Sequence, residues 1–264
     1  MAIKRTPKNQ FRKKSSAKTP KSTTSYSWFN PQQVLRSLFK QKQFGPFFAY
    51  IGLLFIGLTM TWVFLFRFIN PPFTWLMIQR GFERKVEGKT WKLEKHWLSY
   101  EELSDNLKKA AVAGEDAHFM AHAGFDIQAI REAYQKNRAG KPMRGGSTIS
   151  QQTAKNVFLW PGRSWLRKGF ESYFTLLIEM LWGKKRILEV YLNVIETGDG
   201  IYGADAAAEA FFHRPATSLT KRQAALIIAV LPNPRRWSPA KPTAYINRKA
   251  SAIVRYLPHS KIPD

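Results

Sequence analysis

One stretch of the chain restricts its fold more than any other. Residues 47–66 read FFAYIGLLFIGLTMTWVFLF, without a single charged side chain. About 20 helical residues at a rise of 1.5 Å each span the roughly 30 Å hydrocarbon core of a bilayer. A cleaved signal peptide would need a shorter apolar stretch and a small-residue cleavage site, whereas Arg67 and the large residues of FINPPF follow here. The sequence therefore predicts one retained membrane-spanning helix.

The segment before this stretch is strongly basic. Residues 1–46 are rich in Lys, Arg, Ser, Thr, Gln and Pro and contain no Asp or Glu. This composition predicts a disordered tail, and a cationic flank keeps the N-terminus in the cytoplasm. The rest of the chain would then lie on the periplasmic or outer side of the cytoplasmic (inner) membrane.

The net charge of +24 indicates an anionic partner. Nucleic acid is not expected outside the cytoplasm, which leaves the membrane itself, through anionic headgroups, or a lipid-linked phosphate. The chain has no cysteine, so it has neither disulfides nor a thiolate metal site.

Beyond the span, residues 67–100 are expected to form a connector and residues 101–264 one mostly α-helical globule. No run of alternating hydrophobic residues predicts a sheet of any size. Apolar periodicity and end signals such as Ser104, Gly183 and Pro232 predict helices. These helices are expected over residues 104–115, 126–140, 164–183, 184–195 and 221–234.

The stretch GEDAHFMAHAGFD, residues 114–126, contains His118, His122 and Asp126 at intervals of four. On a helix these positions share a face, and a histidine pair at this spacing is typical of zinc helices. Gly124 interrupts that face, however, and no second cluster of ligand residues follows. Spacing alone leaves open whether this is a metal site.

Glu115, in the same stretch, lies near the end of an Ala-rich helix and before Phe119. A helix C-terminus and apolar neighbours disfavour the carboxylate and raise its pKa, as a general acid or base requires near neutral pH. The alternative is an ordinary solvated glutamate.

Two further stretches carry polar side chains at helical spacing. In RGGSTISQQTAKN, residues 144–156, Ser147 can cap a helix whose N-terminus could hold an anion, with Gln152, Lys155 and Asn156 on one face. The alternative is a capped surface helix.

In GRSWLRKGFE, residues 162–171, Arg163, Arg167 and Lys168 precede Glu171. They form either a helical ion-pair ladder or a phosphate clamp. Glu171 would be a second carboxylate, and paired carboxylates with divided roles suit glycosyl chemistry.

The order of these motifs is more specific than any one of them. EDAHFMAHAGFD, GGSTISQQTAKN, RKGFE and KRILEVYLN follow one another within residues 72–240. In this the chain resembles the peptidoglycan glycosyltransferase family, the transglycosylase module of bifunctional penicillin-binding proteins. It is most similar to the monofunctional, membrane-anchored form, because no Lys-Thr-Gly follows the module. Gln223 and Phe211 depart from the family pattern, which often has Glu and Tyr there.

The resemblance implies a lysozyme-like helical fold and a reaction. The growing glycan on its pyrophosphate lipid would be the donor and lipid II the acceptor. A β-1,4 glycan strand would form for the cell wall, with release of undecaprenyl pyrophosphate. Cell-wall synthesis or division proteins are candidate partners. Magnesium could assist the pyrophosphate, although the sequence shows no dedicated cage for it.

The resemblance also assigns residues. Glu115 matches the general base and Glu171 the second carboxylate, whose role stays open. His118 falls at a variable position, so no metal site is expected. The expected substrate-binding residues are Asp116, His122, Ser147, Thr148, Gln152, Lys155, Arg163, Arg167 and Lys168, with Lys155 and Arg163 at the pyrophosphate.

Two other functions compete with this one. A membrane-anchored lytic enzyme of lysozyme-like fold would cleave finished glycan, but a neutral sugar leaving group needs no cationic clamp. A non-enzymatic envelope scaffold would act through its tail and anchor, and substitutions of Glu115 and Glu171 would leave it intact.

Overall fold

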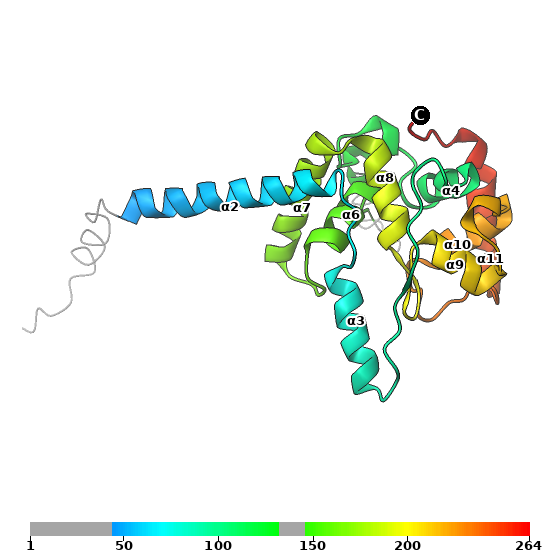
Figure 1. The fold of residues 1–264 in the computed structure, drawn as a ribbon. Coiled ribbons are helices and arrows are strands. Elements are labelled where there is room, and N and C mark those ends of the chain that lie inside the picture. The colour runs from blue at the N-terminus through cyan, green and yellow to red at the C-terminus, as the bar shows by residue number, and fades with distance from the viewer. Residues whose placement is uncertain (1–43, 132–145) are drawn as a thin grey trace, which may run out of the picture. The chain divides into compact units, whose positions relative to one another are not determined.

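The computed structural model describes residues 44–131 and 146–264, and Figure 1 shows their helices. The chain divides into two compact units, residues 1–53 and 54–264. The predicted basic tail over residues 1–46 lies outside the described residues except for its last three positions. In the described part of the chain, one helix is long and apolar enough to cross a membrane, α2 (Phe44–Phe66). The prediction that this apolar stretch forms a helix long enough to cross a membrane is confirmed.

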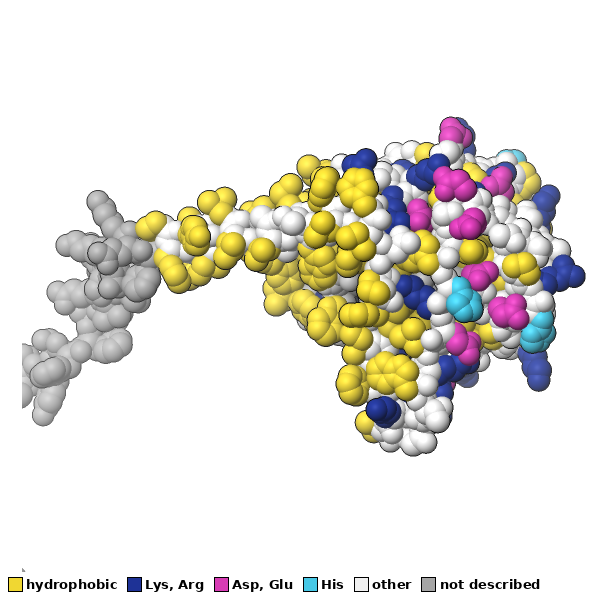
Figure 2. All heavy atoms as spheres, viewed as in Figure 1, with side chains coloured by type: hydrophobic (Ala, Val, Ile, Leu, Met, Phe, Trp, Pro, Cys, Tyr) yellow, Lys and Arg dark blue, Asp and Glu magenta, His cyan; other side chains and the backbone are white. Residues whose placement is uncertain are grey.

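The second half of α2, which belongs to the larger unit, packs against its helices. The hydroxyls of Thr59 and Tyr173 share a hydrogen bond of 2.7 Å. The ring of Trp62 stands edge-on to Phe158, with centroids 5.2 Å apart. Trp182 donates its indole N–H to the carbonyl of Val63 at 2.7 Å. Figure 2 shows hydrophobic side chains gathered over this part of the surface. The end of the apolar helix is therefore built into the globule.

The larger unit is a mostly α-helical globule, as predicted for a lysozyme-like fold. Its other helices are α3 (Trp75–Val86), α4 (Asp105–Glu115), α6 (Ile149–Phe158), α7 (Trp165–Leu181), α8 (Gly183–Val194), α9 (Ala204–Phe212), α10 (Lys221–Val230) and α11 (Ala244–Tyr256). Single 3₁₀ turns cover Phe119–Ala121, Ala216–Ser218 and Leu257–His259. α8 and α10 each contribute a long run of buried side chains to the hydrophobic core.

Most predicted helices are confirmed, and their end signals act as expected. Ser104 accepts a hydrogen bond from the Leu107 N–H and caps α4. Gln223 and Thr220 close a capping box at α10, a role that Gln fills as Glu would. For the helix predicted over 126–140, residues 127–131 are helical and the remainder lies outside the described residues.

Helices α3, α9 and α11 and a small sheet were not predicted. The connector over residues 67–100 contains α3, which Thr74 caps through the Met77 N–H. A three-stranded sheet has the order β1-β3-β2, with β1 (Glu94–Lys95) parallel and β2 (Glu196–Gly198) antiparallel to β3 (Ile201–Tyr202). Strands of two or three residues are too short for an alternating pattern, so the sequence could not reveal them.

Asn193 of α8 ties the connector to the core. Its side-chain oxygen accepts from the Leu98 N–H at 2.9 Å, and its amide donates to the carbonyls of Leu98 at 2.9 Å and Glu189 at 2.8 Å. The residue is 1% exposed, so water cannot replace these bonds. The carbonyl of Asn193 also lies 2.8 Å from where a Cβ on Gly203 would sit, and Gly203 has a φ of +81°. Only glycine allows β3 to approach α8 this closely.

We predict that Asn193→Ala lowers the free energy of unfolding by about 2 kcal/mol, because buried backbone groups lose their partners. Chemical denaturation of the purified chain measures this. Asn233→Ala is the matched control, since Asn233 is exposed, and it should change stability by less than about 0.5 kcal/mol. Equal effects of the two substitutions would contradict the structural role of Asn193.

Candidate active site

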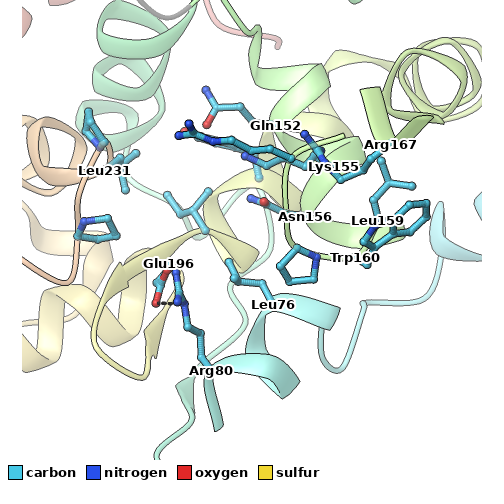
Figure 3. Close-up of a pocket in the computed structure, with 17 residues that line it drawn as sticks. Leu76, Arg80, Gln152, Lys155, Asn156, Leu159, Trp160, Arg167, Glu196 and Leu231 are labelled. Carbon is cyan, nitrogen blue, oxygen red and sulfur yellow. Dashed lines mark ion pairs between the residues drawn. The ribbon is translucent and has the colours of Figure 1, made fainter. Parts of the chain in front are cut away.

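A cleft of about 470 Å³ crosses the larger unit, and Figure 3 shows the side chains that line it. Its walls come from α3, α6, the segment between α6 and α7, the start of α7, α8, β2 and the loop after α10. The lining residues are Leu76, Arg80, Gln152, Lys155, Asn156, Leu159, Trp160, Pro161, Gly162, Arg163, Arg167, Tyr191, Ile195, Glu196, Leu231, Pro232 and Pro234. The predicted polar face of α6, Gln152, Lys155 and Asn156, faces this cleft as the helical spacing required.

Glu115 is the last residue of α4, and its side chain contacts the cleft through Gln152. Gln152 Nε2 donates to Glu115 Oε2 at 3.0 Å, and Lys249 Nζ of α11 lies 3.7 Å from Glu115 Oε1. The Glu115 side chain is only 15% exposed. Burial raises the pKa of Glu115, and the opposing effects of Lys249 and the Gln152 hydrogen bond do not cancel it. The solvated-glutamate alternative is therefore wrong, and the carboxyl is suited to accept a proton.

Asp116 and His122 hold the two helices of the site together. Asp116 Oδ1 lies 2.8 Å from His122 Nε2, and Asp116 Oδ2 accepts from the Ile149 N–H, the first residue of α6, at 3.0 Å. A carboxylate is stabilised at a helix N-terminus by the free N–H groups and the helix dipole. Both residues are buried and neither lines the cleft. Their geometry fits a positioning role rather than the substrate contact expected of them.

The histidine pair does not share a helical face, because α4 ends at Glu115 and a 3₁₀ turn follows. His118 Nδ1 bonds Asp126 Oδ2 at 2.8 Å, whereas His122 bonds Asp116. Each histidine thus has its own carboxylate. Across residues 44–131 and 146–264, no group of three His, Cys, Asp or Glu side chains is placed to hold a metal ion.

The cap of α6 is Thr148, not Ser147 as the sequence suggested. Thr148 Oγ1 accepts from the Gln151 N–H and donates to the Gly124 carbonyl at 2.7 Å, while Ser147 is exposed and precedes the helix. Thr148 is buried, so its hydroxyl serves the fold and not the cleft. Gly124 has a φ of +87°, and a Cβ there would lie 2.7 Å from Thr175 Cγ2 of α7. Glycine is therefore required where this loop passes α7.

Basic side chains line one side of the cleft. Lys155, Arg163 and Arg167 reach into it from α6 and the start of α7. Arg167 Nη1 pairs with Glu171 Oε2 at 3.0 Å, and Lys168 pairs with Glu171 Oε1. Lys155 is half-buried, and this burial lowers its pKa. An anion bound to the Lys155 ammonium would compensate for the hydration that this group loses on burial.

The predicted helical ion-pair ladder is wrong in one respect, the position of Arg163. α7 begins at Trp165 with Ser164 as its cap, so Arg163 precedes the helix and has no i, i+4 relation to Arg167. Arg167 and Glu171 do form the expected helical pair. Only the Arg167–Glu171 step of the predicted ion-pair ladder forms on the helix. Arg163 and Arg167 both line the cleft, which also fits a phosphate clamp.

Several residues of the site were missed from the sequence. Lys249 approaches Glu115 from α11, far along the chain, and no local pattern could reveal it. Arg80 of α3 and Glu196 of β2 meet at 3.3 Å in the cleft wall, and neither element was predicted. Tyr191 lies within the motif KRILEVYLN, which is the signal that could have found it.

Magnesium was expected as a possible helper of the leaving group, and the residues present do not fit a resident ion. Both oxygens of Glu171 are bonded to Arg167 and Lys168. Cationic neighbours of this kind disfavour a second cation, and Mg²⁺ prefers oxygen ligands. We therefore derive no step through a metal.

Comparison with known proteins agrees with the geometry. A family model described as "Transglycosylase" matches residues 84–257. The chain is 52% identical over 202 residues to the biosynthetic peptidoglycan transglycosylase of Stutzerimonas stutzeri, covering 76% of this chain and 84% of that one. It is 49% identical over 224 residues to the protein of the same name from Pseudomonas aeruginosa, covering 85% and 94%. A third such protein, from Caulobacter vibrioides, is 51% identical over 191 residues, covering 72% and 81%.

The raised pKa of Glu115 predicts a pH-dependent stability penalty. Below about pH 4.5 the carboxyl is protonated in both folded and unfolded states, so the full stability is present. As the pH rises through the folded pKa, stability is lost because the folded state resists ionisation. We predict that Glu115→Gln has a higher midpoint of thermal unfolding than the wild type at pH 7, and that the difference disappears near pH 4. A lower midpoint at pH 7 would contradict the desolvation of Glu115.

Proposed function

The chain belongs to the transglycosylase family and is a peptidoglycan glycosyltransferase of cell-wall synthesis, and we propose that Glu115 is its general base. One observation carries this proposal: a desolvated carboxyl is hydrogen-bonded to Gln152, which lines the same cleft as Lys155, Arg163 and Arg167. A base and a group of cations on one cleft are what transfer from a pyrophosphate donor requires.

The substrates proposed are lipid II as acceptor and the growing glycan on its pyrophosphate lipid as donor. The pyrophosphate would lie against Lys155, Arg163 and Arg167, where guanidinium groups can bind two oxygens each. Lys155 is poorly solvated, so its charge acts on an anion through a low local dielectric. The peptide and sugar portions would extend along the remaining cleft.

In the proposed step, the Glu115 carboxylate takes the proton of the acceptor's 4-hydroxyl. The hydroxyl oxygen forms a bond to the anomeric carbon of the donor as the bond from that carbon to the pyrophosphate oxygen breaks. The anomeric configuration inverts to a β-1,4 link, and the leaving pyrophosphate departs with the electron pair. Lys155, Arg163 and Arg167 stabilise the charge that develops on it. The Gln152 amide, 3.0 Å from Glu115, holds the carboxylate in place.

Glu171 is proposed to act by positioning. It is 3% exposed, does not line the cleft, and uses both oxygens to hold Arg167 and Lys168. Of these two partners, Arg167 does line the cleft. Glu171 thus sets the direction of a guanidinium that meets the pyrophosphate, and it does not transfer a proton itself.

The helix α2 anchors the enzyme to the membrane where its lipid-linked substrates reside. We propose that the N-terminus is cytoplasmic and residues 67–264 lie on the outer side. The basic composition of residues 1–46 supports this orientation through the positive-inside rule. Exposed apolar side chains beyond the helix, such as Phe68, Phe73 and Trp75, suit the interface that follows a span.

We predict that Glu115→Gln lowers the rate of polymerisation by about 10²–10⁴-fold, because the base is lost. Labelled lipid II is incubated with detergent-solubilised protein and the products are separated on a gel. Glu209→Gln, an exposed carboxylate, is the control and should keep the wild-type rate. A full rate in Glu115→Gln would refute the base, and cleavage of finished glycan without polymerisation by wild type would support a lytic enzyme instead.

The orientation can be tested because the chain has no cysteine of its own. We predict that a membrane-impermeant thiol reagent labels Glu101→Cys in intact spheroplasts, and that Ser15→Cys is labelled only after lysis. The Glu101 side chain is 68% exposed, so access is not limiting. The opposite labelling pattern would place the cleft in the cytoplasm.

A further inference from the structure

The two sides of the cleft differ in charge. Figure 3 shows Arg80 and Glu196 meeting on one side, with Lys155 and Arg167 on the other. On the side of Lys155, five cations stand against two carboxylates: Lys155, Arg163, Arg167, Lys168 and Lys249 against Glu115 and Glu171. On the side of Arg80, ion pairs join four cations and four carboxylates, of which Arg80 and Glu196 line the cleft: Arg80, Arg84, Lys89, Arg235, Glu83, Glu87, Glu196 and Asp199. The second side therefore offers an anion no net attraction.

The Arg80–Glu196 pair has unused hydrogen-bonding capacity. Arg80 Nη1 bonds Glu83 Oε2 at 2.6 Å, which fixes the guanidinium on α3. Arg80 Nε lies 3.3 Å from Glu196 Oε1, but within the described residues neither atom has a partner of hydrogen-bond geometry. The Glu196 side chain is 9% exposed. Buried polar atoms without partners are costly, so a ligand that pairs with them gains affinity.

Tyr191 adds a third such group to the same cleft. Its hydroxyl is buried and, among residues 44–131 and 146–264, has no hydrogen-bond partner. Tyr191 lines the cleft together with Arg80 and Glu196. A donor from Arg80, an acceptor on Glu196 and a hydroxyl that can do either therefore lie unbonded just beneath the surface of the cleft.

We propose that Arg80 and Glu196 bind uncharged sugar groups, the hydroxyl and acetamido groups of the glycan, and so fix the sugar end of the substrate relative to the pyrophosphate end. A sugar hydroxyl accepts from Arg80 and donates to Glu196 at once, without changing the charge of the wall. A phosphate or carboxylate would meet the Glu196 carboxylate instead. Arg80 reaches the cleft from α3, which begins before residue 84, where the family-model match starts.

The inference rests on the proposed function for the identity of the sugar, but its test needs no turnover. The full chain in detergent is titrated with two probes, the uncharged oligosaccharide chitotetraose and inorganic pyrophosphate, by ligand-observed NMR. Glu196→Gln should weaken chitotetraose binding about tenfold and leave pyrophosphate binding unchanged or tighter. Lys155→Gln should do the reverse. Arg80→Gln should follow Glu196→Gln, and Glu209→Gln should bind both probes as wild type does.

Glu196→Gln preserves shape, and its unfolding midpoint is measured so that a binding loss is not mistaken for unfolding. In polymerisation assays it should raise KM for lipid II more than it lowers kcat. Wild-type affinity for chitotetraose in a folded Glu196→Gln, no chitotetraose binding by wild type, or a loss of pyrophosphate binding in Glu196→Gln would each overturn the proposal. The proposed function fails on a different result, namely that wild type does not polymerise lipid II.

Discussion

The site depends on the Asp116 carboxylate. One of its oxygens meets His122 and the other accepts from the first N–H of α6, so the end of α4 is tied to the start of α6. Because Glu115 precedes Asp116 in the chain, this tie also fixes the base. Gln152, one turn into α6, then reaches it. Thr148, which caps α6 and donates to the Gly124 carbonyl, helps to hold the start of α6 beside the end of α4.

This junction places the Glu115 carboxyl in a poorly hydrated part of the site, near Lys155, which is also desolvated by burial. Burial raises the pKa of Glu115 and lowers that of Lys155, so the charged form of each group is disfavoured. Such an arrangement costs stability and favours catalysis. A substrate that donates a proton to Glu115 and brings a negative charge to Lys155 offsets the desolvation of both groups. The opposite side of the cleft, with Arg80 and Glu196, is balanced in charge and suits neutral groups.

Much of this could be predicted from the sequence because it is local. Helix spacing placed Gln152 and Lys155 on one face, and the apolar surroundings of Glu115 indicated a raised pKa. What could not be predicted depends on contacts between distant segments. Lys249 reaches Glu115 from α11, and Arg80 meets Glu196 across more than a hundred residues. The prediction of Ser147 as the cap of α6 was also wrong: the cap is Thr148, because a neighbouring carbonyl and burial decide between two adjacent hydroxyls.

The most direct test of the central claim is the titration of Glu115 itself. The side-chain carboxyl ¹³C shift is followed with pH in selectively labelled protein, assigned by its absence in Glu115→Gln, and compared with the acid limb of kcat/KM for lipid II. The account predicts a midpoint above the ordinary glutamate value of about 4.3 that coincides with the acid limb. A midpoint at or below that value, or an acid limb unrelated to it, would contradict the account.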